Sequence, residues 1–344
     1  MPNEKAKIIR FHTLGGPEVL RIDEVPLPEP GPGEVRLRVH AFGLNHSEIL
    51  FRSGNYLRAA VLPSKLGYEA SGIVEAVGKG VDNSMIGRAY SSVPGFDMGK
   101  YGVYGEVAIL PAESLAAYPE NLSFVEGASV WMAYLTAYGP LVHLAAIRSG
   151  DYVVITAASS SVGLAALDIV RAEGAISIAT TRNPGKKDKL LAMGADHVIV
   201  TSQEDVALRI REITGNMGAR VIFDAVGGDG VRELAEAATF GGIIFIYGLL
   251  TMAATPFPVV LSITKGLTMR GFAMHEITLN PALRAEAERY LYERLENGQF
   301  KPKIDRIFKF GQIVEAHRYM ESSQQVGKIA VTVNDVDTPL PSLL

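Results

Sequence analysis

Seven small residues separate an apolar run from a helical segment in the middle of the chain, in the order Ala-Ala-Ser-Ser-Ser-Val-Gly. The run before them, residues 152–156, is typical of a buried strand, and the residues after them predict a helix. Small side chains let backbone N–H groups and the positive end of the helix dipole approach a pyrophosphate. This arrangement predicts a dinucleotide site, whose expected contacts are Ser159, Ser160, Ser161, Val162 and Gly163.

The turn departs from the glycine-rich fingerprint of dinucleotide-binding folds, G-x-G-x-x-G. Ala158 and Ser160 stand at the first two glycine positions, and only Gly163 remains for close packing between helix and strand. Ser160 could crowd the pyrophosphate or form a hydrogen bond with it. On its own, the turn also fits a plain strand-to-helix connection in any α/β protein.

The end of the next apolar run carries basic and hydroxyl side chains where sites for NAD place a carboxylate. Residues 180–187 read TTRNPGKK and include no acid. Thr181, Arg182 and Lys186 suit a 2′-phosphate, because a guanidinium offers a planar fork and an ammonium a compact charge. NADPH is therefore the expected cofactor, and a solvated basic loop is the alternative. Val226 and Gly248 follow later apolar runs and are further candidate contacts.

These segments need a scaffold in which strands and helices alternate. Six apolar runs with helical segments between them predict a doubly wound parallel sheet of the Rossmann type, since parallel neighbours require long crossovers. Before them, short alternating stretches between glycines and prolines predict an irregular β domain. The six runs are 152–156, 176–180, 197–200, 221–224, 243–247 and 267–272; the early stretches are 34–39, 70–77 and 106–109; helical segments are expected at 128–146, 283–297 and 313–322, and a closing strand at 328–333.

Composition narrows the classes of partner. The chain has 33 basic and 37 acidic residues, so it has no surplus charge for nucleic acid and no basic cluster for a membrane. It has no cysteine, which excludes disulfides, iron–sulfur clusters and cysteine-ligated zinc. No apolar run reaches the roughly 18 residues that span a bilayer. At 344 residues, two domains are expected, in a cytoplasmic enzyme with a small-molecule partner.

Taken together, the motifs of the chain resemble the medium-chain dehydrogenase/reductase superfamily, and within it the zinc-independent quinone oxidoreductase-like branch. The resemblance implies an α/β protein with a GroES-like β-rich catalytic domain and an inserted Rossmann domain. Its implied limits are 1–127 for the GroES-like domain, 128–272 for the Rossmann NADPH-binding domain and 273–344 for a C-terminal return to the catalytic domain. Besides the serine-rich turn, the motifs are GGPEVL (15–20), PGPGEVRLRV (30–39), GLNHSEILFRSGNY (43–56), LGYEASGIVEAVGKGV (66–81), LTAYGPL (135–141), GADHVI (194–199), FDAVGG (223–228) and VGKIAVTV (326–333).

In zinc-dependent members of this superfamily, the catalytic metal binds a Cys, a His and a second Cys or an acid. The matching positions here are Asn45, Tyr68 and Met132, and none is a credible zinc ligand. The short segment 96–104 replaces the four-cysteine lobe that holds a structural zinc. No metal site is therefore expected, and His46 is expected to be a hydrogen-bonded pocket or core residue.

Without a Lewis acid, deprotonating an unactivated alcohol is difficult, whereas reducing a quinone or conjugated carbonyl needs a well-placed hydride and modest polarisation. We therefore expect transfer of hydride from NADPH to a quinone or to an α,β-unsaturated carbonyl or thioester. Asn45 is expected to donate a hydrogen bond to the acceptor oxygen, and Tyr56, Tyr68 or water to supply the proton. By analogy with the family, Thr136 contacts the nicotinamide and Lys328 contacts a cofactor phosphate.

Two other functions stay open from the sequence, a zinc-type alcohol dehydrogenase and a non-catalytic NADPH-binding protein. Aromatic packing is the alternative role for both tyrosines. The resemblance also implies that residues 267–274, LTMRGFAM, form an edge strand that pairs across a two-fold axis, so a homodimer is expected. An edge covered by the C-terminal tail is the alternative.

Overall fold

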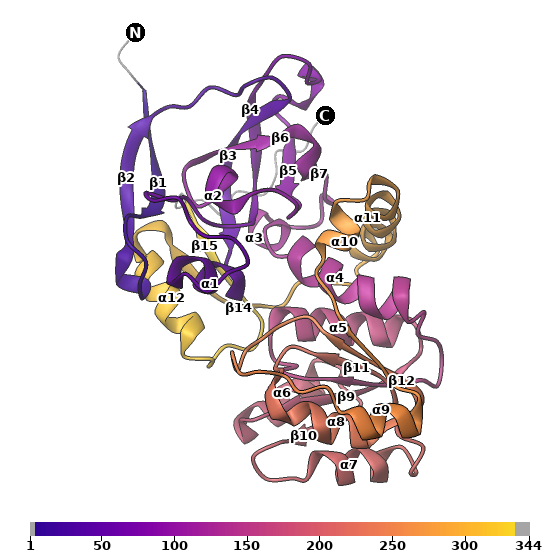
Figure 1. Cartoon of the computed structure of the whole chain (residues 1–344). Helices are drawn as coiled ribbons and strands as arrows, with labels where there is room; N and C mark the ends of the chain where they lie inside the picture. The colour runs from indigo at the N-terminus through magenta and orange to yellow at the C-terminus, as the bar shows by residue number, and fades with distance from the viewer. Residues whose placement is uncertain (1–3, 334–344) are drawn as a thin grey trace. The chain divides into compact units, whose positions relative to one another are not determined.

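The computed structural model describes residues 4–333, which fall into two units. Unit 1 comprises the described residues up to Met132 together with those from Glu288 onward, and unit 2 is Ala133–Ala287. Figure 1 follows the chain through both units by colour. The domain limits expected after residues 127 and 272 stay predictions. Within residues 4–333, no helix is both long and apolar enough to cross a membrane.

Unit 2 is built on a six-stranded sheet in the order β10-β9-β8-β11-β12-β13, and all neighbouring strands are parallel. Each of the six expected apolar runs forms one strand, which confirms the doubly wound Rossmann sheet. The strand order reverses between β8 and β11, where such sheets bind ligands beyond the carboxyl ends of the strands. The strands are β8 (Tyr152–Ile155), β9 (Ile176–Thr181), β10 (His197–Val200), β11 (Ala219–Asp224), β12 (Ala238–Ile246) and β13 (Thr268–Gly271).

Helices cover the two faces of this sheet. Val154, Ile178 and Ile222 point to one face and share a buried cluster with residues of α7 and α8. Figure 1 shows α5 on the other side of the sheet from α7, α8 and α9. The helices around unit 2 are α4 (Trp131–Tyr138), α5 (Ser161–Ala172), α6 (Lys187–Ala192), α7 (Val206–Ile213), α8 (Val231–Ala237), α9 (Val259–Lys265) and α10 (His275–Thr278).

The helical segment expected at residues 128–146 is not one continuous α-helix. Helix α3 (Phe124–Gly127) ends before it, α4 ends at Tyr138, and a π-helical turn, Gly139–Leu144, follows. Pro140 has no N–H to donate to the preceding turn. A Cβ at position 139 would lie 2.2 Å from Cζ of Phe272, so this junction requires glycine.

Unit 1 contains a seven-stranded sheet in the order β14-β15-β3-β4-β5-β7, with β6 also paired to β3, and a separate pair of β1 and β2. The C-terminal strand β15 runs antiparallel to β3, with Ala330 opposite Gly43, so the end of the chain completes the sheet of the first third. This confirms the β-rich GroES-like domain. Its strands are β1 (Lys5–Phe11), β2 (Leu20–Pro26), β3 (Glu34–Gly43), β4 (Glu69–Val77), β5 (Ala89–Ser92), β6 (Val107–Pro111), β7 (Leu115–Ala116), β14 (Ile304–Lys309) and β15 (Lys328–Thr332); its helices include α1 (His46–Ser53), α2 (Met98–Tyr101) and α12 (Ile313–Glu321), and α11 (Pro281–Glu296) spans the boundary between the units.

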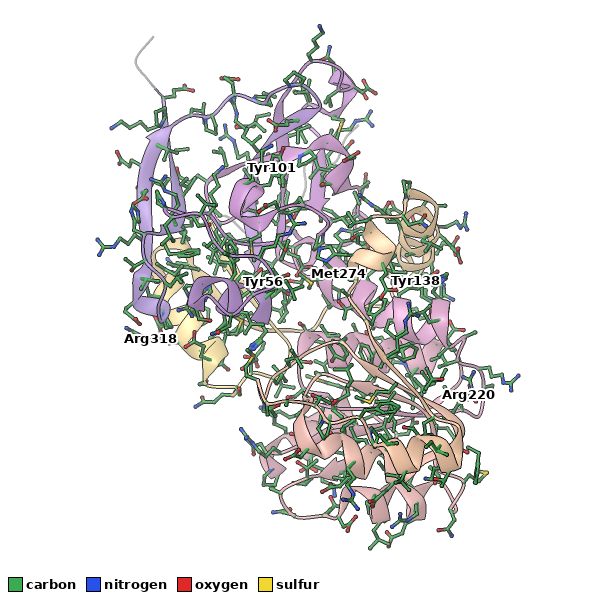
Figure 2. The ribbon with its side chains drawn as sticks, viewed as in Figure 1. Tyr56, Tyr101, Tyr138, Arg220, Met274 and Arg318 are labelled. Atoms are coloured by element: carbon green, nitrogen blue, oxygen red, sulfur yellow. The ribbon has the colours of Figure 1, made fainter. Side chains whose placement is uncertain are left out.

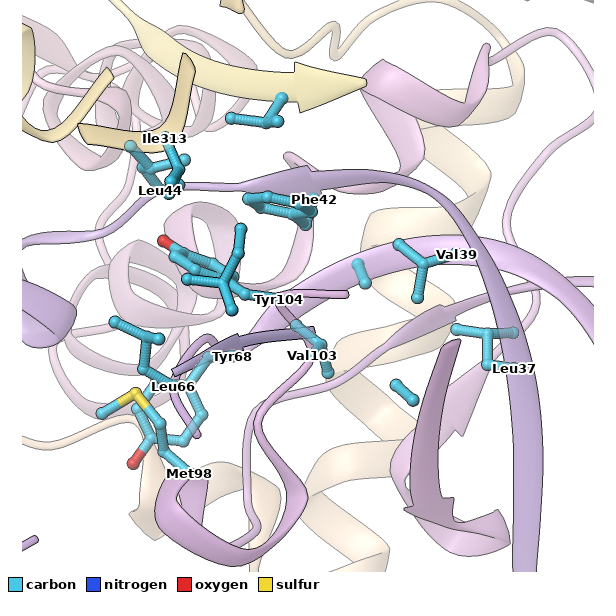
Figure 3. Packing of buried hydrophobic residues seen from close by; sticks show 14 of the residues in the cluster. Leu37, Val39, Phe42, Leu44, Leu66, Tyr68, Met98, Val103, Tyr104 and Ile313 are labelled. Carbon is cyan, nitrogen blue, oxygen red and sulfur yellow. The ribbon is translucent and has the colours of Figure 1, made fainter. Parts of the chain in front are cut away.

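Alternate residues of β3 fill the core of unit 1, as the two-residue period of a strand requires. Val35, Leu37 and Val39 are fully buried. Near the end of β3, Phe42 stacks on Tyr104 with 4.3 Å between ring centroids. Figure 3 labels Leu37, Val39, Phe42 and Tyr104 in this buried apolar cluster. The end of β3 leads directly into Leu44 and Asn45, which precede α1.

A histidine lies in this core without polar partners. His317 on α12 is fully buried, its ring makes an edge contact with Tyr104, and neither nitrogen has a hydrogen-bond partner among the described residues. Burial, with a smaller contribution from the nearby positive charge of Arg52, lowers the pKa of His317 to about 3. The ring of His317 is therefore neutral in the folded protein at neutral pH.

We expect His317 to make unit 1 less stable in mild acid. The unfolded chain binds a proton below pH 6.5 and the folded chain does not, so each pH unit below 6.5 costs about 1.4 kcal/mol. His317→Phe should reduce the loss of stability between pH 6.5 and 5 by about 2 kcal/mol, measured by urea unfolding across this range. His143→Phe, at an exposed position, is the control. An unchanged pH dependence in His317→Phe would show that the ring already protonates in the folded state.

Candidate functional site

The serine-rich turn of unit 2 joins β8 to α5, and one of its own side chains caps the helix. Ser160 is the N-cap of α5, and its Oγ accepts a hydrogen bond from the Gly163 N–H at 3.0 Å. Ala157 adopts a left-handed conformation with φ of 46°. A serine at the second glycine position of the fingerprint therefore caps the helix.

Gly163 packs against the backbone at the start of the turn. A Cβ at this position would lie 2.5 Å from the carbonyl oxygen of Ala158 and 2.6 Å from its Cα. Because those are backbone atoms, they cannot move aside without shifting the turn. The structure thus gives Gly163 the close-packing position that the sequence indicates.

The loop after β9 supplies a cation to this turn. Lys186 is 8% exposed, and its Nζ donates to Ser159 Oγ at 3.1 Å. Thr181 is buried at the end of β9, whereas the side chain of Arg182 is exposed. The structure therefore brings Lys186 and Ser159 together and leaves Arg182 at the surface.

Asp224, which the sequence marked only as part of a motif, organises the carboxyl ends of β8 and β11. Its Oδ1 accepts from Thr156 Oγ1 at 2.5 Å and from the Val226 N–H at 3.0 Å, and its Oδ2 accepts from the Gly227 N–H at 3.0 Å. A Cβ on Gly248 would lie 2.8 Å from the Ala225 carbonyl oxygen, so these segments pack backbone to backbone. In the sequence, the signal for this network was an acid, Asp224, at the end of an apolar run.

Thr136, the expected nicotinamide contact, lies in α4 and is 8% exposed. Its role and those of the other expected cofactor contacts stay predictions.

Unit 1 contains a buried polar cluster formed by Asn45, Glu48, Glu69 and Lys328, none of which is more than 8% exposed. Nζ of Lys328, the first residue of β15, donates to Asn45 Oδ1 at 2.6 Å and forms an ion pair with Glu69 at the start of β4. Glu69 also accepts a hydrogen bond from the Met132 N–H at 2.9 Å. In this structure the ammonium of Lys328 is thus engaged by residues of unit 1, and its contact with a cofactor phosphate stays a prediction.

Glu48 closes the other side of this cluster. It accepts from the backbone N–H groups of Asn45 at 2.5 Å and Tyr68 at 3.2 Å, and its Oε1 lies 3.4 Å from Asn45 Nδ2. Burial raises the pKa of Glu48 to about 8, partly offset by the charge of Lys328. The sequence assigns no role to Glu48 or Glu69, although the apolar residues around each acid were a signal of burial.

Tyr56 and Tyr68 lie together, with their hydroxyl oxygens 3.3 Å apart. Figure 2 labels Tyr56 on the loop that follows α1. Burial raises the pKa of both hydroxyls, so both keep their protons at neutral pH. Tyr56 makes an edge contact with Phe51 and Tyr68 a tilted contact with Phe96, so these rings also pack in the core.

His46 occupies the first turn of α1 and differs from its expected setting. The residue is exposed and makes no hydrogen bond to the described residues. The expectation of a core residue is therefore wrong, because Asn45 and Glu48 are buried at this end of α1 and His46 is not. A position in a pocket stays a prediction.

Two family models match the chain. The alcohol dehydrogenase GroES-like domain matches residues 31–120, in unit 1. The model described as zinc-binding dehydrogenase matches residues 161–289, which include most of the Rossmann sheet.

Relatives match over nearly the whole length. The 2-haloacrylate reductase of a Burkholderia species is 30% identical over 93% of this chain and 97% of its own, and a Pseudomonas aeruginosa quinone oxidoreductase is 31% identical over 94% and 98%. The crystal structure of Escherichia coli quinone oxidoreductase complexed with NADPH is 28% identical, with a TM-score of 0.87 over 95% of this chain and all of that one.

The chain therefore belongs to the medium-chain dehydrogenase/reductase superfamily, in its quinone oxidoreductase-like branch. It is an oxidoreductase of a nicotinamide-dependent family.

The contact between Gly163 and Ala158 can be tested directly. We expect Gly163→Ala to displace the start of α5, lower stability by about 1–3 kcal/mol and weaken binding of a nicotinamide cofactor by about tenfold or more. Gly230→Ala is the matched control, because a Cβ there has nothing within 4 Å. Thermal unfolding and a fluorescence titration with NADPH measure the two effects. Equal behaviour of the two variants would contradict the close-packing role.

Proposed function

We propose that the chain is an NADPH-dependent reductase that passes hydride, without zinc, to a quinone or to an α,β-unsaturated carbonyl or thioester. The observation that carries this proposal is the buried contact of Asn45 and Glu69 with Lys328. A lysine ammonium at this place repels a divalent cation and occupies the oxygens that such a cation would need. Among residues 4–333, no three His, Cys, Asp or Glu side chains form a group that could hold a metal.

The residues of unit 2 fit a phosphorylated dinucleotide. Lys186 beside the turn, with Thr181 and Arg182, would hold the 2′-phosphate, and no carboxylate follows β9 to favour the ribose of NAD. The turn from Ser159 to Gly163 would hold the pyrophosphate, Val226 and Gly248 would line the strand ends, and Thr136 would contact the nicotinamide. When bound, NADPH supplies the hydride.

Unit 1 supplies the groups that suit an acceptor. The Asn45 amide would donate a hydrogen bond to the acceptor oxygen as negative charge develops there. Tyr56 or Tyr68, both protonated at neutral pH, or water would supply the proton. The names of a 2-haloacrylate reductase and a quinone oxidoreductase among the relatives support an activated double bond or a quinone as the acceptor.

We also propose a cytoplasmic homodimer. Strand β13 is an edge of its sheet, hydrogen-bonded to β12. Val259, Val260 and Ile263 of α9 are 53%, 74% and 77% exposed. An open strand edge and an exposed apolar helix within one unit support pairing with a second copy.

Turnover without metal is the central expectation. Purified protein should oxidise NADPH with at least one of 9,10-phenanthrenequinone, a 2-alkenal and crotonyl-CoA, and 1,10-phenanthroline should leave the rate unchanged. Stoichiometric zinc that turnover requires would instead indicate a zinc-type alcohol dehydrogenase. Binding of NADPH with no turnover across a broad acceptor panel would indicate the non-catalytic alternative.

Lys186 should determine the preference for NADPH over NADH. A charged hydrogen bond to phosphate contributes about 1.5–3 kcal/mol, so Lys186→Ala should weaken NADPH binding by about tenfold or more and leave NADH binding nearly unchanged. Lys189→Ala, an exposed position in α6, the helix that Lys186 precedes, is the control. Calorimetric titration with both cofactors measures the change. Equal losses for NADPH and NADH would place Lys186 away from the 2′-phosphate.

A further inference from the structure

The fold makes a specific space for the side chain of Lys328. A Cβ on Gly43 would lie 2.6 Å from Lys328 Cε and 2.3 Å from the carbonyl oxygen of Ala128. Gly43 pairs with Ala330 in the sheet, which fixes the start of β15 beside it. The lysine stem therefore enters the interior through a gap that only glycine leaves open.

Lys328 determines which way the Asn45 amide points. An ammonium has donors and no acceptor, so the atom of Asn45 that faces it at 2.6 Å must be the carbonyl oxygen. The amide nitrogen is then turned away from Lys328. One of its N–H groups points to Glu48 Oε1 at the long distance of 3.4 Å. The other N–H makes no hydrogen bond to the described part of the chain.

Glu69 in turn holds Lys328. Their side chains are each 1% exposed, and the carboxylate is itself fixed by the Met132 N–H. The contacts therefore run from the Met132 backbone through Glu69 and Lys328 to Asn45. Donation to the carbonyl oxygen of an amide also polarises its N–H groups, which makes them stronger donors.

We propose that Lys328 is a positioning residue for the reduction, which fixes the Asn45 amide so that its N–H donates to the acceptor oxygen. This role rests on the proposed function and differs from a contact with a cofactor phosphate. It acts on the chemical step through Asn45 and leaves the affinity for NADPH unchanged.

A double-mutant cycle separates these roles. We expect Asn45→Ala to lower kcat by about 100-fold, as for loss of a donor to a developing oxyanion. Lys328→Met should lower kcat by tenfold to 100-fold with less than a threefold change in the Kd of NADPH. In the Asn45→Ala background, Lys328→Met should lower kcat by less than a further twofold.

A second variant serves as the control for a loss of folding. Lys328→Met leaves Glu69 buried without its counter-charge, so Glu69→Gln/Lys328→Met, which keeps the cluster neutral, is measured beside it with thermal unfolding. It should show the same loss of kcat. Lys301→Met, an exposed lysine from the same end of the chain, should behave as wild type. A tenfold weaker affinity for NADPH in Lys328→Met, or additive losses with Asn45→Ala, would overturn the positioning role.

A readout independent of turnover distinguishes failure of this role from failure of the proposed function. In protein labelled with ¹⁵N-asparagine, the side-chain resonances of Asn45 are those missing from Asn45→Ala. Loss of the Lys328 hydrogen bond in the neutral double variant should shift them. If wild-type protein turns over no acceptor, the proposed function fails, and the shift still tests the orientation of the amide. Unshifted resonances would overturn the inference.

Discussion

Lys328 places a positive charge in the interior of unit 1, and its surroundings are built around that charge. A buried ammonium is tolerated only when its donors are paired. Glu69 provides the opposite charge, Asn45 an oxygen, and Gly43 the space for the aliphatic stem. The same contact connects the residue before α1, the start of β4 and the first residue of β15. A single ion pair thus links Asn45, which we propose binds the acceptor, to the sheet that supports it.

In unit 2 the corresponding constraint is close approach of backbone to backbone. Gly163 and Gly248 both lie where a Cβ would meet the main chain, and Asp224 fixes two adjacent strand ends by accepting main-chain hydrogen bonds. The turn tolerates alanine and serine at its first two fingerprint positions because Ser160 caps the helix. Of the three glycines in the fingerprint, the chain keeps only Gly163, the position that contacts backbone atoms.

Periodicity in the sequence predicted the architecture well. All six Rossmann strands and the closing strand at Lys328 were expected from buried apolar runs, since parallel strands covered on both faces have a strong hydrophobic signal. Strand β14 was missed, because its pattern is mostly exposed and resembles a loop. For the site, the sequence and its family resemblance named Asn45, Tyr56, Tyr68 and Lys186, whose roles stay predictions. The sequence could not show that Glu69 and Lys328, 259 positions apart, form an ion pair.

Because β15 follows unit 2 in the sequence, the two units differ in when they can be completed during synthesis. Unit 2 is continuous, and all of its strands are available once the ribosome has passed residue 271. The sheet of unit 1 lacks β14 and β15 until residues 304–332 have emerged, and Glu69 lacks the charge of Lys328 before then. A polypeptide truncated before Lys328 exposes an open edge of β3 and an unpaired acid, which are features that chaperones and proteases can recognise. The ion pair therefore forms only once β15 has completed the sheet of unit 1.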